Sequence, residues 1–435
     1  MTAIVRQTFG RHLAKLFLGD NDCYIGIGKS DTFSVTDAVV SPSNNIREER
    51  EFRNNLQSIK KVEGSTFVVP RVNWSSGTLY SGWLDSVRPD DGHAQYVMTG
   101  LNHVYVCISE ARNSVGEHIP SFIEPRFGIE EGVDLLDTFT TADGYTWKFL
   151  FALSTTRINQ FLSSNYIPVE HIETTPSDAF QQQQLDVQNG SIGGQVISAI
   201  VESAGSGYTV APSVTVVGNG TGATAVATIN TGGLRKITMT NYGQGYDYAS
   251  FIIEGNAKAR AIVTSSEGLG ANPINDLKTS SMLFTIKPNG TENGTFVVEN
   301  SFRQIGLLEN LTLVGSTDVY NGVSTKVLNT LTLDVDGGFS AGNKITGDVT
   351  GAVAFIDDVQ DNIIHYHQNE STGFVKFINS ETVSEIGGTG SGIISSTVSL
   401  HTVDRYSGEV LYIENRARII RDQEQQEDIK IVITV

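Results

Sequence analysis

The chain has 435 residues, a length that favours two or three domains over one. Its 48 acidic side chains outnumber 30 basic ones, and the formal charge of −18 argues against a protein that grips nucleic acid. A hydrophobic fraction of 39% suffices for a core, the two cysteines are too few for a disulfide framework, and no apolar stretch approaches the roughly 20 residues that span a bilayer. We therefore expect a soluble protein, made in a reducing compartment and without a membrane partner.

The first 180 residues hold most of the helical signal. The run from Asn44 to Glu51 is mostly charged or polar and leads into Phe52. Phe52, Leu56 and Ile59 fall on one face of a 3.6-residue period, which predicts a helix. Residues 95–98 and 104–108 are rich in β-branched and aromatic side chains and predict strands.

The tryptophans lie in this same part of the chain. Tyr145, Trp147, Phe149 and Phe151 alternate after the turn at 143–144, so one strand face is aromatic. A core face is the favoured interpretation, because an exposed aromatic patch promotes aggregation unless a partner covers it. An interface is the alternative for Tyr145, Trp147 and Trp74, and Trp83 lies in a looser context that favours exposure.

A second helix is predicted over 155–162, and the polar run at 181–184 is interpreted as a connector. From about 195 to 400 short β runs alternate with glycine, which is typical of sandwiches or barrels. Gly205-Ser-Gly207-Tyr208 and Gly243-Gln-Gly245-Tyr246 form an internal echo whose tyrosines lie 38 residues apart, and the stretch 347–354 is a weaker third copy.

Several fragments resemble cofactor or catalytic motifs but lack the required context. Gly28-Lys29-Ser30 ends like a phosphate-binding loop, yet Cys23 occupies the position of the first glycine. The glycines of 218–223 are followed by too few residues for a dinucleotide-binding helix, and the G-x-S-x-G run at 338–342 leads into further β structure. We interpret all three as turns and expect no cofactor.

Two groups of ionisable residues are also candidates. His365 and His367 share one face of a predicted strand and could hold a metal, but no third ligand is suggested nearby, so ordinary histidines are favoured. The adjacent acids at 130–131 and 357–358 point to opposite strand faces, unlike the paired carboxylates of glycan hydrolases. We expect no metal and no catalytic site: the protein is not an enzyme.

A series of blocks in chain order carries a resemblance to a known family. The ten blocks are residues 2–9, 24–28, 72–77, 96–98, 104–108, 120–125, 143–151, 165–169, 407–416 and 427–431. In these blocks the chain resembles the baseplate wedge subunit of the gene-product-eight type from contractile-tailed, T-even-like bacteriophages, especially the cyanophage versions. The stretch from about 190 to 400 has no such match.

The resemblance implies a structural protein of the virion tail baseplate, synthesised in the host bacterial cytoplasm. Its implied partners are a second copy, as a homodimer, and other baseplate wedge proteins, with rearrangement when the tail sheath contracts. The competing hypothesis is a carbohydrate-binding tail or host-adhesion protein that uses the β modules.

The expected fold is mainly β with a few short helices. Residues 1–185 and 400–435 would form a β-sandwich-like, discontinuous scaffold domain. A small β module at 190–265, which holds the tyrosine echo, and a second β-rich module at 270–399 would be inserted in it.

Overall fold

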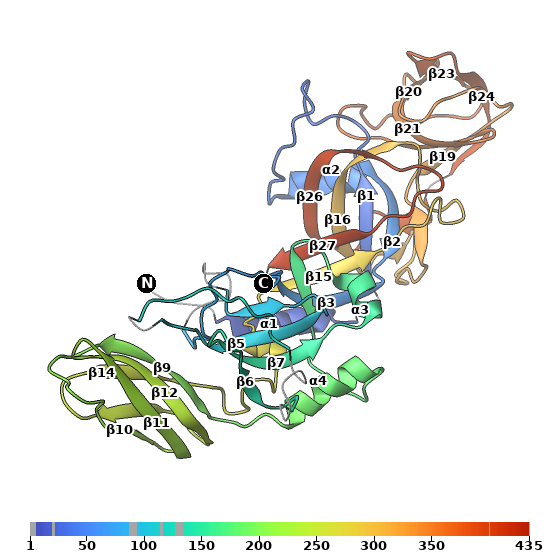
Figure 1. Ribbon diagram of the computed structural model, residues 1–435. Helices are drawn as coiled ribbons and strands as arrows, with labels where there is room; N and C mark the ends of the chain where they lie inside the picture. The colour runs from blue at the N-terminus through green and yellow to red at the C-terminus, as the bar shows by residue number, and fades with distance from the viewer. Residues whose placement is uncertain are drawn as a thin grey trace. The chain divides into compact units, whose positions relative to one another are not determined.

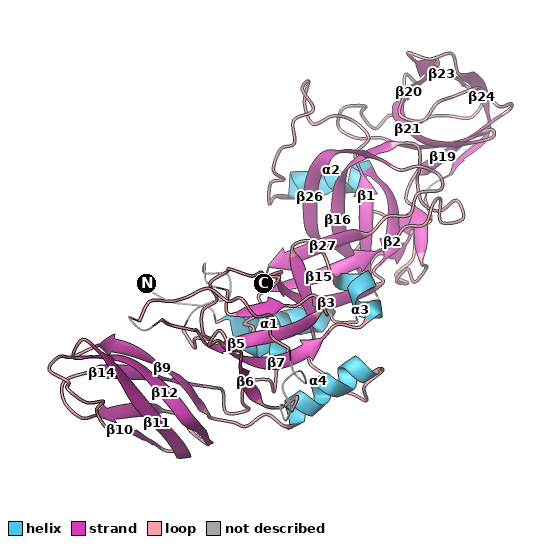
Figure 2. Ribbon diagram, viewed as in Figure 1, coloured by secondary structure: helices cyan, strands magenta, loops and turns pink. Residues whose placement is uncertain are grey.

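The computed structural model describes residues 6–19, 22–86, 94–113, 116–126, 134–399 and 401–434. Strands make up 42% of the structure and helices 11%, so the expectation of a mainly β protein with short helices is confirmed (Figure 2). The chain divides into two compact units, each built from separated segments. Unit 1 comprises residues 1–12, 66–283 and 434–435, and unit 2 comprises 13–65 and 284–433.

Unit 1 contains a four-stranded antiparallel sheet in the order β4-β5-β7-β6. Its strands are β4 (Tyr96–Met98), β5 (His103–Ser109), β6 (Thr138–Thr140) and β7 (Thr146–Ala152). The unit also holds α3 (Thr155–Phe161), β8 (Tyr166–Val169), α4 (Ala179–Asn189) and α5 (Pro273–Asp276). The strands predicted at 95–98 and 104–108 and the helix predicted at 155–162 are confirmed.

A small β module completes unit 1 (Figure 1). Its strands are β9 (Val196–Ser203), β10 (Val214–Gly218), β11 (Thr221–Asn230), β12 (Gly233–Gln244), β13 (Ala249–Ile253) and β14 (Lys258–Val263). One sheet has the order β10-β13-β14-β9, and β11 pairs with β12. Exchanging β9–β11 for β12–β14 reproduces the β10–β13 pairing and interchanges the β14–β9 and β11–β12 pairings, so the module is an intertwined duplication.

The echoed tyrosines explain how the two repeats hold together. The Tyr208 hydroxyl of the first repeat accepts hydrogen bonds from the backbone N–H groups of Asn256 and Ala257, both at 2.9 Å. The Tyr246 hydroxyl of the second repeat accepts one from Ala223 N–H at 3.4 Å. Each tyrosine hydroxyl is therefore hydrogen-bonded to the backbone of the opposite repeat.

Unit 2 contains a five-stranded sheet in the order β18-β2-β1-β16-β26. Its strands are β1 (Cys23–Gly28), β2 (Leu56–Lys61), β16 (Ser301–Glu309), β18 (Ser324–Lys326) and β26 (Glu409–Ile420). Helix α2 (Ile46–Asn55) packs against this sheet through Phe52, which shares a core cluster with Tyr24 and Leu308. The short strands β17 (Thr312–Leu313) and β25 (Val403–Asp404) pair with each other, and η1 (Lys15–Phe17) is a single turn.

A closed barrel forms the rest of unit 2, in the order β19-β22-β21-β20-β23-β24. The strands are β19 (Asn329–Leu333), β20 (Lys344–Gly347), β21 (Val353–Gln360), β22 (Ile363–His367), β23 (Thr382–Ile386) and β24 (Ser391–Ser399). Buried Leu331, Ile356 and Tyr366 belong to its own hydrophobic core. The weak third copy of the echo, at 347–354, lies in this barrel and not in the small module.

Four elements run across the boundaries between the units along the chain: α1 (Gln7–Ala14), β3 (Gly64–Pro70), β15 (Ser281–Ile286) and β27 (Ile429–Thr434). The compact units thus have different boundaries from the domains expected at 1–185 plus 400–435, 190–265 and 270–399. The reason lies in strand pairing: β1 pairs with both β2 and β16, which ties residues 23–61 to residues beyond 300.

Two local predictions are wrong. The helix predicted through Leu56 and Ile59 ends at Asn55, because the following residues pair as β2 with β1. The run at 181–184 is part of α4, whose N-cap Asp178 accepts a hydrogen bond from Gln181 N–H, and not a connector.

None of the helices in the described ranges is both long and apolar enough to cross a membrane.

Candidate functional site

The aromatic candidates from the sequence lie largely inside unit 1. Tyr145 and Trp147 are fully buried in one core cluster and Trp74 packs partly buried against it, as the core interpretation predicts. Trp83 is only 8% exposed, so the expectation of an exposed anchor is wrong. Its indole N–H donates to the carbonyl of Asp276 at 2.8 Å, and the Lys278 ammonium lies 4.9 Å from its ring centroid. The chain itself therefore covers this side chain.

The histidine and acid candidates meet in unit 2 as a buried polar network. His367 Nδ1 lies 2.5 Å from Asp357 Oδ2, and both side chains are fully buried. Asp357 Oδ1 accepts hydrogen bonds from Gln57 Nε2 at 2.9 Å and Asn300 Nδ2 at 3.2 Å. The network joins the barrel strands β21 and β22 to the neighbouring sheet, and both side chains of the pair are shielded from solvent.

His365 lies beside different partners. Burial and the nearby Lys326 ammonium lower the pKa of His365 to about 4, which keeps the ring neutral at pH 7. In the described ranges no group of three or more histidine, cysteine, aspartate or glutamate side chains is placed to hold a metal ion. The acids at 130–131 lie outside the described residues.

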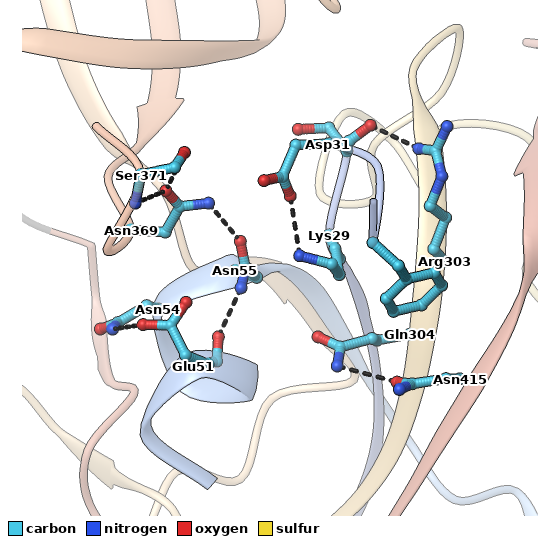
Figure 3. Close-up of polar contacts among 12 residues, drawn as sticks. Lys29, Asp31, Glu51, Asn54, Asn55, Arg303, Gln304, Asn369, Ser371 and Asn415 are labelled. Carbon is cyan, nitrogen blue, oxygen red and sulfur yellow. Dashed lines mark hydrogen bonds and ion pairs between the residues drawn. The ribbon is translucent and has the colours of Figure 1, made fainter. Parts of the chain in front are cut away.

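A polar cavity of about 360 Å³ opens beside α2, and we call it the α2 cavity. Figure 3 shows several of its side chains, which come from the turn after β1 and from α2, β16 and β26. Its lining residues are Lys29, Phe33, Val40, Ser43, Asn45, Arg47, Glu48, Glu51, Asn55, Gln304, Glu370 and Asn415. All of them belong to unit 2.

Local backbone chemistry brings β1 and α2 together at this cavity. A Cβ on Gly28 would lie 2.3 Å from the carbonyl oxygen of Asn55, so only glycine permits this approach. The next N–H, that of Lys29, donates to the same carbonyl at 3.0 Å, and Lys29 has a φ of 65°. At the other end of α2 the N-cap Asn45 accepts a hydrogen bond from Glu48 N–H at 2.9 Å. The Gly28-Lys29-Ser30 run is thus a turn, as predicted, and it forms one cavity wall.

Two hydrogen-bonded side-chain amides, those of Asn415 and Gln304, determine which polar atom faces the cavity. Asn415 Nδ2 donates to the carbonyl of Val40 at 2.9 Å, so Asn415 Oδ1 faces Gln304 and accepts from Gln304 Nε2, also at 2.9 Å. A carbonyl can only accept, so this order fixes both amides. Gln304 Oε1 is left without a partner in the described residues, although Gln304 is only 2% exposed.

The charges around the cavity are unevenly paired. Lys29 Nζ lies 3.0 Å from Asp31, and Arg47 pairs with Glu370 at 2.5 Å. The hydrogen bond from Arg47 lowers the pKa of Glu370. Glu48 and Glu51 form no ion pair with a basic side chain among the described residues, so the cavity carries excess negative charge.

A second cavity of about 540 Å³ is lined in part by the same chain segment that leads into α2. It is lined by residues 42–46, Glu49 and Val410 to Ile413. These last residues belong to β26, which pairs with β16 along one edge and ends the sheet. In the described part of the chain no strand pairs with the other edge of β26.

Neither cavity was predicted from the sequence. A polar pair, Arg303 and Gln304, inside the otherwise apolar run 302–308 is the signal that was available, because a buried strand rarely carries such residues without partners.

In comparisons with known proteins, no family model matches the chain and no curated protein matches it.

Proposed function

We propose that this protein is a structural subunit of a phage tail baseplate wedge, not an enzyme, which dimerises and links the wedge to peripheral baseplate proteins. The observation that carries the proposal is the open edge of β26, a strand of 12 residues whose sequence complements itself. The backbone N–H and C=O groups of an unpaired strand edge can pair with a strand of another chain, and such pairing is one way in which the subunits of an assembly bind each other.

The self-complementarity follows from an antiparallel register. With Asn415 on the two-fold axis between two copies of β26, Glu414 faces Arg416 of the second copy. In the same register Tyr412 faces Arg418, and Leu411 faces Ile419. Opposite charges and apolar pairs directly across two strands each stabilise a sheet, so this register is favourable along its length.

The side chains of β26 are free enough to form such a contact. Leu411 is 37% exposed and Ile420 49% exposed. The Arg416 and Glu414 side chains are 39% and 31% exposed; they pair with each other at 2.8 Å within the strand, and this pair would be exchanged for the contacts across the two-fold axis. A closed two-fold arrangement also consumes both edges, which prevents open-ended aggregation.

Two further observations support the wedge hypothesis. One of the sequence blocks that resemble the wedge family, residues 407–416, overlaps β26 itself. The charge of −18 favours neighbours with basic surfaces, as expected for a building block that joins other subunits.

The test is the mass of the purified chain by light scattering across a range of concentrations. The wild type should be a dimer, and Arg416→Glu should raise the dimer dissociation constant about tenfold or more, because two carboxylates would then face each other across the paired strands. The double variant Glu414→Arg/Arg416→Glu restores the pairing and should restore the dimer. Arg50→Glu makes the same charge change at an exposed position on α2 and serves as control.

A monomeric or trimeric wild type contradicts the proposed dimer, as does Arg416→Glu behaving like Arg50→Glu. Mixing the dimer with the co-encoded tail proteins then tests the wedge itself, since a wedge subunit must co-purify with at least one of them.

A further inference from the structure

We infer that the α2 cavity is a receptor for a guanidinium group, the side chain of an arginine carried by another protein. The inference concerns a different contact from the pairing of β26 edges, although Asn415 of β26 lines the cavity, and it does not depend on the proposed dimer. It rests on three observations: an unpartnered buried acceptor, an excess of carboxylates, and a cavity that opens between them.

The acceptor is Gln304 Oε1. Figure 3 shows the oxygen of Gln304 turned away from Asn415, toward the side on which Lys29 and Asn55 lie. The amide cannot rotate to relieve this, because Gln304 Nε2 is held by Asn415 Oδ1 and Asn415 Nδ2 by a carbonyl. A buried carbonyl oxygen without a partner costs free energy, so a donor that reaches it is bound favourably.

On the opposite wall the available acceptor is the Glu51 carboxylate, because the Asn55 amide is already hydrogen-bonded. Asn55 Nδ2 donates to the carbonyl of Glu51 at 2.7 Å, and Asn55 Oδ1 accepts from Asn369 Nδ2 at 2.8 Å. The polar atoms of the Asn55 side chain are therefore occupied. The Glu51 carboxylate accepts one hydrogen bond, from Asn54 Nδ2 at 3.2 Å, and retains capacity for others.

The charge balance selects a cation. Lys29 is neutralised by Asp31 and Arg47 by Glu370, whereas Glu48 and Glu51 remain. An anion would meet these carboxylates, so phosphate or carboxylate ligands are disfavoured.

Guanidinium fits better than ammonium for geometric reasons. Its planar fork offers five donors, which can reach Gln304 Oε1 and a carboxylate at once, whereas an ammonium is a compact and strongly hydrated point charge. The Phe33 ring lines the same cavity, and the Lys29 ammonium lies 5.4 Å from its centroid, so the ring already faces a cation of the cavity wall. A volume of about 360 Å³ lies within the range of small-ligand sites and admits one side chain.

The test uses the full-length protein and three short blocked peptides that differ in one side chain: arginine, lysine or citrulline. Citrulline has the shape of arginine without its charge. Titration calorimetry should give the arginine peptide the lowest dissociation constant, with the lysine peptide about threefold and the citrulline peptide about tenfold weaker.

Two variants assign the binding to the cavity. Glu51→Gln should weaken the arginine peptide about tenfold, whereas Glu202→Gln, the same charge change at an exposed position of unit 1, should leave it unchanged. Gln304→Met removes the acceptor in a side chain of similar length and should weaken binding in a protein whose melting temperature shows that it is folded.

Equal affinities for the arginine and citrulline peptides overturn the inference, as does the absence of binding by the arginine peptide at 10 mM, about the weakest affinity that titration resolves. Equal losses in Glu51→Gln and Glu202→Gln also overturn it, because they would show attraction to the acidic chain as a whole. The mass of Arg416→Glu and its affinity for the arginine peptide are measured separately, so failure of one proposal is distinguishable from failure of the other.

Discussion

Removing the carboxylate of Asp357 should selectively destabilise unit 2. Asp357 and His367 are fully buried, and they face each other at 2.5 Å where the barrel meets the sheet of β1, β2 and β16. In Asp357→Ala the hydrogen bond to His367 Nδ1 is lost. The other ring nitrogen, Nε2, already has no partner among the described residues, so the ring is left without a hydrogen bond there.

The magnitude follows from what each former partner retains. Gln57 Nε2 keeps the carbonyl of Ser301 at 3.2 Å, and Asn300 Nδ2 keeps the backbone carbonyl of residue 357 at 3.3 Å. Their losses are therefore small, and most of the cost comes from the buried imidazole. Leaving a buried hydrogen-bonding group without its partner costs about 1–3 kcal/mol, and we expect a value in that range.

The assay exploits the distribution of tryptophan. Trp74, Trp83 and Trp147 are the three tryptophans of the chain, and all lie in unit 1. Urea unfolding followed by tryptophan fluorescence therefore reports on unit 1, and hydrogen exchange of peptides covering β21 and β22 reports on the barrel. Asp357→Ala should speed exchange in the barrel while the fluorescence transition moves little.

Glu370→Ala is the control, since Glu370 lies in the loop that follows the barrel strand β22 and is 46% exposed in its pair with Arg47. Its loss should leave hydrogen exchange in the barrel close to that of the wild type, because an exposed ion pair contributes little to stability. If Asp357→Ala destabilises the barrel no more than Glu370→Ala, the buried pair does not hold the barrel to the sheet and our reasoning is wrong.

Three further predictions concern single residues. Burial lowers the pKa of His401 to about 3, so between its ordinary pKa of about 6.5 and that value the unfolded chain binds a proton that the folded chain does not. Stability should fall on acidification by up to about 1.4 kcal/mol per pH unit from this group, and His401→Gln should reduce the slope of melting temperature against pH; an unchanged slope contradicts this. Tyr208→Phe leaves two backbone N–H groups of the small module unpaired and should cost about 1–2 kcal/mol, more than Tyr246→Phe, whose hydroxyl accepts a single bond at 3.4 Å. Exchange rates in β11 and β14 check the order of the two effects, which equal rates would refute. Gly28→Ala places a Cβ 2.3 Å from the Asn55 carbonyl and should lower the free energy of unfolding of unit 2 by about 1–3 kcal/mol. Hydrogen exchange of peptides covering β1 and α2 measures this loss, and unaltered exchange rates would show that β1 and α2 separate easily.

Properties set by neighbouring residues were readable from the sequence. The alternation of Tyr145, Trp147 and Phe149 predicts a buried strand face, and all three are buried. The repeated Gly-x-Gly-Tyr pattern at 205–208 and 243–246 indicates a duplication, and both copies lie in one module. Side-chain alternation and turn chemistry act over a few residues, so the sequence carries them directly.

The end of helix α2 shows where that reasoning stops. Phe52, Leu56 and Ile59 have helical spacing, and all three do enter one core cluster. They reach it from a helix and then a strand, because β1 offers backbone partners to residues after Asn55. Pairing with a distant strand outweighed a local period that fitted equally well.

By itself the sequence determined that this is a mainly β protein, that residues 95–98 and 104–108 form strands, and that the alternating aromatics from Tyr145 to Phe151 are buried, since these depend on local periodicity and burial tendency. Only the tertiary structure decided that each echoed tyrosine is hydrogen-bonded to the opposite repeat, and that strands within residues 23–61 form a sheet with strands beyond residue 300. It also decided that the side-chain oxygen of Gln304, beside a cavity, has no partner among the described residues. Those outcomes depend on which backbone and side-chain groups meet across long chain separations, and hydrogen-bond satisfaction at such meetings is not encoded in any short stretch of residues.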